Sequence, residues 1–146
     1  MFRGRFEHTI DSKGRVSIPA KFRELLVEKY DERLILTNFD RCLVAYPFEE
    51  WRSVEEKVGS LSMVKKEVRA FQRFFISGAA ECPIDKLGRI LIPPTLRDYA
   101  QLGRNVVFNG MLKKFEIWSK DRWQEEIKRS EENFEGMSEA LAGLGI

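Results

Sequence analysis

Two segments of the chain carry an aspartate, a glycine and an arginine in the same order and at the same spacing. The first is residues 11–15, which read DSKGR, and the second is residues 85–89, which read DKLGR. An aspartate can accept hydrogen bonds from the amides that follow it, and a glycine tolerates the positive φ of a tight reversal. The same carboxylate can also hold the guanidinium of an arginine across the turn. The pattern predicts two hairpin turns braced by Asp11, Gly14, Asp85 and Gly88.

A braced turn can present rigid cations to a partner. A two-stranded ribbon fits the major groove of DNA, where Arg or Lys pairs with guanine O6 and N7, and neighbouring cations neutralise phosphates. Lys13 stands at the tip of the first turn and Arg15 at its strand edge. The interpretation is a double-stranded DNA interface. Its predicted residues are Arg3, Arg5, Lys13, Arg15, Lys21, Arg23, Lys86 and Arg89.

The second turn differs from the first at its tip. Leu87 stands where the first turn has Lys13, although Lys86 supplies a cation beside it. We therefore rank the first turn as the main DNA reader. Whether the second turn contacts DNA or serves a subunit interface is left open by the sequence.

The charge distribution supports this interpretation better than the formal net charge of +2 does. Residues 1–23 contain six Lys and Arg against two acidic residues, whereas residues 120–146 contain four against seven. A basic first segment and an acidic last segment make the molecule electrically lopsided. We interpret the acidic segment as a solvated helix face.

Catalytic and metal chemistry find little support in the sequence. Cys42 and Cys82 form no C-x-x-C pair and are expected to be buried thiols, and the single His8 cannot hold a metal alone. Each motif aspartate has its own arginine, which opposes a metal-dependent hydrolase or nuclease. No catalytic residue, cofactor, metal or small-molecule substrate is predicted.

The chain is an internal duplication. Residues 11–19 align with residues 85–93 at an offset of 74, and the match continues from residues 22–25 to residues 96–99. Further along, residues 33–36 align with residues 104–107. Finally, Tyr46 and Trp51 parallel Trp118 and Trp123.

Each copy is expected to contain a β-hairpin, a short helix and a second β-hairpin. Alternating apolar residues predict strands at 6–10 and 16–18. Two further strands are predicted at 34–37 and 43–46, and the second copy repeats them at 106–109 and 115–118. Pro19 and Pro93 end a strand and begin a helix, which in the first copy buries Phe22, Leu25 and Leu26.

Two such copies predict an α+β fold with a shared β-barrel about a pseudo-two-fold axis, because one copy alone buries too little surface. The expected parts are residues 1–60, the first repeat with its closing helix; residues 61–79, a connecting helix; and residues 80–146, the second repeat with a C-terminal helix. The connecting helix is expected to pack Val64, Val68, Phe71 and Phe75 on the barrel. The last helix is expected to begin near Ser119, with fraying or contacts after Glu135.

The two D-x-x-x-R motifs, each followed by Ile-Pro, and the opening MFRGRFEHTID closely resemble the MraZ family. This is a bacterial family in the AbrB-like, swapped-hairpin group of transcription factors, and the resemblance weakens only in the tail. It implies a swapped-hairpin barrel and binding to short promoter repeats of the division and cell-wall gene cluster. It also implies homo-oligomeric rings, in which linked weak contacts gain affinity through effective concentration.

Two alternatives to a transcription regulator remain at this point. One is an antitoxin that neutralises a partner protein, which the two repeats and the aromatic C-terminal segment disfavour. The other is a ring-forming scaffold whose basic face binds an acidic protein. The sequence shows no signal peptide and no apolar run of membrane-spanning length, so we expect a cytoplasmic, nucleoid-associated protein.

Overall fold

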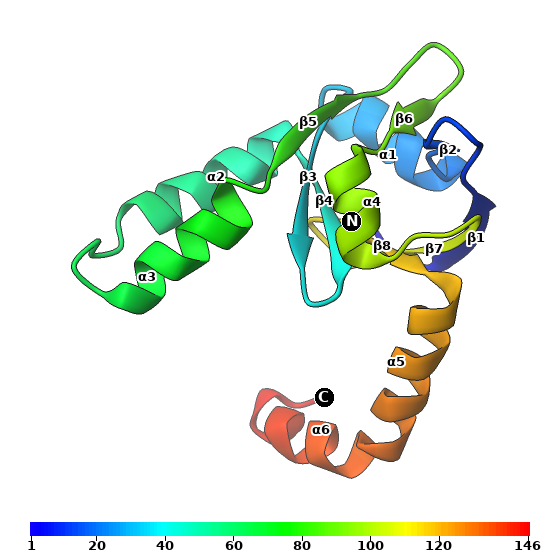
Figure 1. The fold of residues 1–146 in the computed structure, drawn as a ribbon. Coiled ribbons are helices and arrows are strands. Elements are labelled where there is room, and N and C mark those ends of the chain that lie inside the picture. Colours follow the sequence, from blue (N-terminus) through cyan, green and yellow to red (C-terminus); the bar gives the residue numbers. More distant parts are fainter.

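The computed structural model describes residues 1–146, and its centre is a six-stranded antiparallel sheet (Figure 1). The strand order is β1-β7-β8-β4-β3-β5. The strands of this sheet are β1 (Arg5–Thr9), β3 (Arg33–Phe39), β4 (Cys42–Pro47), β5 (Ala80–Pro83), β7 (Asn105–Gly110) and β8 (Phe115–Ser119). A separate two-stranded ribbon joins β2 (Arg15–Ser17) to β6 (Arg89–Leu91). Mixed α+β architecture and all six predicted strand positions are confirmed.

The strands on either side of each Asp–Arg turn pair with the other repeat. Strand β1 pairs with β7, β5 pairs with β3, and β2 pairs with β6. The prediction that the two strands flanking each turn pair with each other as a hairpin is therefore wrong, because the turn forms but its strands pair with strands of the other repeat. Cross-repeat pairing places Val16 of β2 and Ile90 of β6 in one shared core. The edge strands β1 and β5 do not pair with each other, so no closed barrel is found.

The strand registers correct the predicted alignment of the two repeats. Thr9 lies opposite Asn105, and Pro83, at the position equivalent to Thr9, lies opposite Arg33. The residue equivalent to Arg33 is thus Asn105 and not Arg104, a slip of one position. Because side chains alternate between the two faces of a strand, a one-residue slip would exchange core and surface positions.

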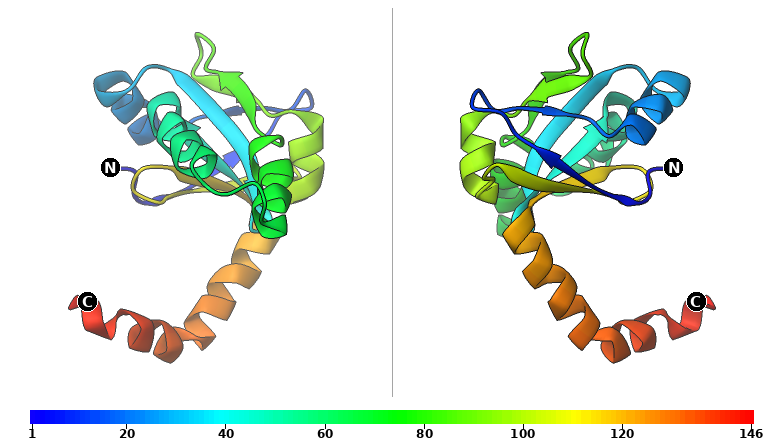
Figure 2. Two further views of the ribbon diagram at one scale, coloured as in Figure 1. Left: turned by 90° about the vertical axis from the view of Figure 1, so that its left-hand side faces the viewer. Right: turned by 90° about the vertical axis from the view of Figure 1, so that its right-hand side faces the viewer.

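Two short helices pack on the sheet and two longer helical segments project from it. Helices α1 (Ala20–Lys29) and α4 (Pro94–Ala100) each follow a ribbon strand, and α1 buries Phe22 and Leu26. A first arm is formed by α2 (Phe48–Gly59), α3 (Lys66–Phe71) and the π-helical η1 (Gln72–Ile76). A second arm is formed by α5 (Lys120–Glu132), α6 (Phe134–Leu141) and the 3₁₀ turn η2 (Ala142–Leu144). Figure 2 shows the second arm leading away from the sheet.

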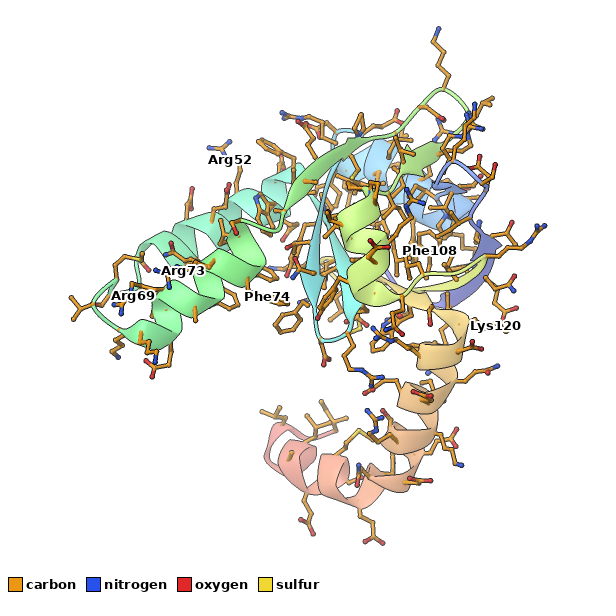
Figure 3. All side chains as sticks on the ribbon, viewed as in Figure 1. Arg52, Arg69, Arg73, Phe74, Phe108 and Lys120 are labelled. Carbon is orange, nitrogen blue, oxygen red and sulfur yellow. The ribbon has the colours of Figure 1, made fainter.

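The first arm departs from prediction at its beginning. Val64 is not a packing residue: it is 87% exposed and precedes the helix, whereas Phe75 is buried. The loop before α3 is held instead by Arg69, whose guanidinium donates to the carbonyls of Met63 and Val64 at 3.0 and 2.8 Å. Figure 3 shows Arg69 and Arg73 on this arm, which projects from the sheet.

The second arm begins as predicted and ends differently. The Ser119 hydroxyl caps α5 by accepting from the Arg122 amide at 3.1 Å. Of the two outcomes expected after Glu135, fraying is wrong, because α6 and η2 continue the helical backbone to Leu144, and use in contacts stays a prediction. The Glu, Met, Ala and Leu residues of this stretch favour a helix over an irregular tail.

The sheet carries a hydrophobic core on both faces. The larger core packs the ribbon, α1 and α4 on one face, and it includes Val16, Ile90 and Phe2. The smaller core packs the first arm on the other face through Trp51 and Phe75. Residues of the central strands β3 and β4 therefore alternate between two buried environments, which fixes the sheet rigidly beneath the ribbon.

Candidate nucleic-acid interface

Each turn is held by one aspartate that links the turn amides to the arginine. Asp11 Oδ1 accepts from the Lys13 and Arg15 amides, both at 2.9 Å, and Oδ2 accepts from Arg15 Nε at 2.8 Å. Asp85 makes the same three contacts with Leu87 and Arg89, at 2.9, 2.9 and 3.0 Å. The arginine side chain is thereby held at its Nε, while its terminal nitrogens stay free to donate elsewhere.

The hydrogen bonds of the first turn lower the pKa of its aspartate. The Arg15 amide, then the Arg15 side chain and the Lys13 amide, lower the pKa of Asp11 from 3.8 to about 2. The pKa of Asp85 is lowered by the equivalent contacts, first among them the Arg89 amide. Both carboxylates are therefore ionised across the neutral pH range.

The low pKa of Asp11 predicts an acid-sensitive turn. A group with a depressed pKa stabilises the folded state above its unfolded pKa, and that contribution is lost as the pH falls through the folded value. We expect the turn contacts to persist at pH 5 and to be lost between about pH 4 and pH 2. A ¹³C NMR titration of the Asp11 carboxyl checks this, with Asp11→Asn to assign the signal. A midpoint near 3.8 would contradict it.

The ribbon brings both motif arginines to one surface. Val16 and Ile90 face each other at its centre and are buried, 1% exposed each. The flanking pairs are Arg15 opposite Leu91 and Ser17 opposite Arg89. Because side chains alternate along a strand, all four residues of these flanking pairs point away from the core. The two turns lie at opposite ends of this ribbon, and both lie far from the second arm (Figure 2).

The two turns are also locked to each other through the backbone. The Ile92 amide donates to the Gly14 carbonyl at 3.0 Å, and the Ile18 amide donates to the Gly88 carbonyl at 2.9 Å. Gly14 has a φ of 88° and Gly88 a φ of 80°, in the region that favours glycine. The ribbon and both turns therefore form one rigid unit.

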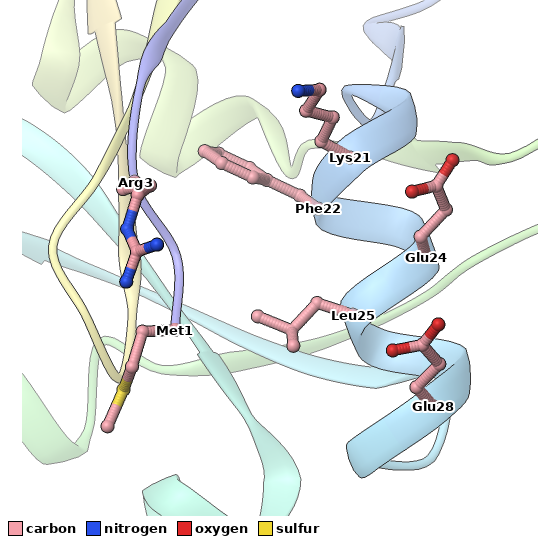
Figure 4. Close-up of a pocket in the computed structure, with 7 residues that line it drawn as sticks. All are labelled: Met1, Arg3, Lys21, Phe22, Glu24, Leu25 and Glu28. Carbon is pink, nitrogen blue, oxygen red and sulfur yellow. The ribbon is translucent and has the colours of Figure 1, made fainter.

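Several predicted cations lie away from the first turn. Arg3 and Lys21 line a cleft with Glu24 and Glu28, as Figure 4 shows. The Arg5 guanidinium lies over the Trp123 ring of α5, 5.2 Å from its centroid. Arg5 begins β1 and Arg3 precedes it, so both lie at the end of β1 that is remote from the first turn.

Arg23 lies beside the second turn rather than the first. A Cβ added to Gly88 would come within 2.5 Å of an Arg23 terminal nitrogen. The structure does keep Lys13 and Arg15 together at the first turn, and Lys86 and Arg89 at the second.

Sequence reasoning missed two arginines that the structure brings to the first turn. Arg97 packs on Gly14, and Arg104 lines a cleft with Asp11, Ser12 and Arg97. Both arginines belong to the second repeat, so no local spacing points to them. The offset of 74 does make Arg97 the equivalent of Arg23, and that is the one signal that could have found it.

The cysteines, the histidine and the acidic residues are not gathered into a metal-binding group. No group of three or more His, Cys, Asp or Glu side chains is placed to hold a metal. Burial raises the pKa of the Cys42 thiol strongly and that of Cys82 to about 11, so both stay protonated. Burial lowers the pKa of His8. None of the helices has both the length and the apolar character needed to cross a bilayer.

Comparison with known proteins identifies the family to which this duplicated chain belongs. The family model described as MraZ protein, antitoxin-like, matches twice, at residues 1–74 and 75–144. The chain belongs to the MraZ family. This double match agrees with the duplication seen in the sequence and in the strand exchange.

Relatives of this MraZ-family chain carry one name, transcriptional regulator MraZ. The protein from Caldanaerobacter subterraneus subsp. tengcongensis is 49% identical over 146 residues, 100% of both chains. That from Syntrophobacter fumaroxidans is 47% identical over 99% of this chain and 97% of its own. That from Desulfitobacterium hafniense is 45% identical over 100% of both chains. These names are those of regulators and not of enzymes.

One solved structure is also similar to this MraZ-family chain. The solution structure of PHS018 from Pyrococcus horikoshii covers 80% of this chain and 88% of that chain, at 15% identity and a TM-score of 0.34. That likeness is too weak to inform the fold.

Proposed function

We propose that this chain is a transcription regulator that binds double-stranded DNA sequence-specifically through the β2–β6 ribbon. The observation that carries the proposal is the position of Arg15 and Arg89 on one outward face of a ribbon built by both repeats. The relatives named as transcriptional regulators support it. The ribbon with its two turns also supports the swapped-hairpin architecture as the framework of this interface.

The shape and chemistry of the ribbon suit the major groove. A two-stranded ribbon enters that groove, and an arginine there can donate two hydrogen bonds to a guanine. The braces to Asp11 and Asp85 hold each arginine at its Nε, so less conformational entropy is lost on binding. Exposed Lys13 and Lys86 would contact phosphates on either side.

The proposed targets are short promoter repeats, including those of the division and cell-wall gene cluster. A ring of identical subunits in the cytoplasm, at the nucleoid, would present one ribbon per subunit to successive repeats. Exposed apolar side chains on the arms offer surface for contacts between copies of the chain. They include Leu61, Met63, Phe134, Met137, Leu144 and Ile146.

The first test is the effect of Arg15→Ala on sequence-selective binding. A duplex enriched from a random library on the purified protein is compared with its scrambled version by fluorescence anisotropy. Arg15→Ala is expected to weaken binding to the enriched duplex by about 1–3 kcal/mol per site, or roughly 5- to 150-fold. Binding to the scrambled duplex should change far less.

A matched control separates base reading from simple loss of charge. Arg129 lies on α5, where it pairs with Glu126 at 3.1 Å, so Arg129→Ala removes one cation far from the ribbon. We expect it to leave selectivity unchanged. If Arg15→Ala weakened binding to the enriched and scrambled duplexes equally, Arg15 would have no base-reading role. If no duplex were enriched from the library, the proposed function would be overturned.

A second candidate is an antitoxin-like or scaffold protein that binds another protein. The observation in its favour is the exposed apolar surface of α6, where Phe134 is 65% exposed, together with the antitoxin-like description of the family. Purification from the native cell tests it. A stoichiometric partner lost on Phe134→Asp would support this candidate.

A further inference from the structure

The exchange of strands gives each turn a neighbour from the opposite repeat. Arg97 of α4 lies against the first turn, and its equivalent Arg23 of α1 lies against the second. The Ile10 amide donates to the carbonyl of Arg104 at 2.8 Å, which brings that residue to the first turn as well. The surroundings of the two turns can therefore be compared position by position.

At one pair of equivalent positions the side-chain charge has opposite signs. The registers that make Asn105 equivalent to Arg33 also make Arg104 equivalent to Glu32. The first turn thus faces two arginines from the other repeat, whereas the second faces one arginine and one glutamate. At the second turn Arg23 pairs with Glu32 at 3.8 Å.

The two arginines at the first turn have no such partner. Neither Arg97 nor Arg104 takes part in an ion pair within 4.0 Å. The nearby Asp11 uses both carboxylate oxygens on its own turn and on Arg15. The surplus positive charge beside the first turn is therefore available to an external anion.

The geometry holds one of these arginines in place and leaves it able to donate. Arg97 Nε donates to the Ile92 carbonyl at 2.9 Å, which fixes the side chain. Its guanidinium covers Gly14 so closely that an added Cβ would lie 2.7 Å from the Arg97 Cζ. Its terminal nitrogens stay unbonded within the chain, at a cleft that Ser12, Gly103 and Arg104 also line.

We propose that Arg97 and Arg104 form a phosphate-binding subsite for the DNA backbone beside the first turn. The inference rests on the proposed function, which it deepens by making the two turns unequal. A guanidinium fork matches the oxygens of a phosphodiester, and phosphate contacts fix the register of a protein on a duplex. The second repeat thereby anchors the turn of the first repeat on DNA.

The salt dependence of DNA binding tests the subsite with Arg104→Gln. Arg104 is exposed, and its side chain makes no hydrogen bond in the chain, so the variant should fold normally. Each phosphate contact contributes about 0.9 to the slope of log K against log salt concentration. We expect Arg104→Gln to reduce that slope by about 1 on enriched and scrambled duplexes alike, with their affinity ratio unchanged.

Controls separate this subsite from general surface charge. Lys128→Gln removes an exposed cation on α5 and should leave the slope as it is. Arg97→Lys keeps the charge but loses the planar fork, so we expect weaker binding to both duplexes with the slope retained. Glu32→Arg, which gives the second turn the charge of the first, should raise the slope.

The outcomes for the subsite and for the proposed function are distinguishable. An unchanged slope in Arg104→Gln overturns the subsite, and the loss of selectivity in Arg15→Ala would still uphold the proposed function. A reduced slope without any sequence preference in the wild type would uphold the subsite and overturn sequence-specific regulation. If Lys128→Gln lowered the salt-dependence slope as much as Arg104→Gln does, the subsite would be overturned, because the effect would then be that of net charge.

Discussion

Replacing Arg15 and Arg89 together by alanine is expected to remove most of the preference for the enriched duplex over its scrambled version. Each arginine that pairs with a guanine contributes about 1–3 kcal/mol of discrimination, so the pair contributes about 2–6 kcal/mol. The smaller value already corresponds to roughly 30-fold in affinity. The two arginines extend from the same ribbon face, so one duplex can contact both.

Measuring the two single variants beside the double variant decides whether the second turn reads DNA. The turns lie at opposite ends of the ribbon, and each arginine has its own aspartate, so near-additive losses are expected. Circular dichroism and thermal unfolding serve as the folding control for all three proteins. If Arg89→Ala matches the wild type and the double variant matches Arg15→Ala, the second turn has no part in base recognition.

Replacing Phe2 by alanine is expected to lower the free energy of unfolding by about 3–5 kcal/mol, the usual loss for a buried phenylalanine. Phe2 is 1% exposed, and its ring centroid lies 5.3 Å from that of Phe22 and 5.2 Å from that of Phe115. Its backbone amide and carbonyl bond to Leu112 at 2.7 and 2.9 Å. Truncation would leave a cavity in the core that supports β1, β7 and α1.

Urea unfolding followed by tryptophan fluorescence measures this loss as a shift of the midpoint. Phe134→Ala is the matched control, because that ring is 65% exposed on α6 and its removal should change stability far less. Equal stability of the two variants would show that the core does not depend on Phe2. If the unfolding free energy of Phe2→Ala depended less steeply on urea concentration than that of the wild type, the surface exposed on unfolding would have changed.

Local features of this protein were predictable because they depend on residues close in sequence. The Asp11–Arg15 contact spans four positions, so its residue types and spacing suffice to indicate a braced turn. Ser119 begins a helix because its hydroxyl reaches an amide three residues later. The short, nearly continuous apolar runs of β3 and β4 likewise mark them as buried strands wherever their partners lie.

Long-range features were decided only by the tertiary structure. A period of two shows which side chains are buried, but it does not show which strand lies alongside, because that choice depends on the burial available to the whole chain. The pairing of β2 with β6 brought Arg15 and Arg89 to one face, and the pairing of β1 with β7 brought Arg104 to the first turn. The sequence by itself thus determined the duplicated turns and their braces. The strand exchange determined which charges surround each turn, since those charges come from residues that lie close together only after the two repeats have folded into one core.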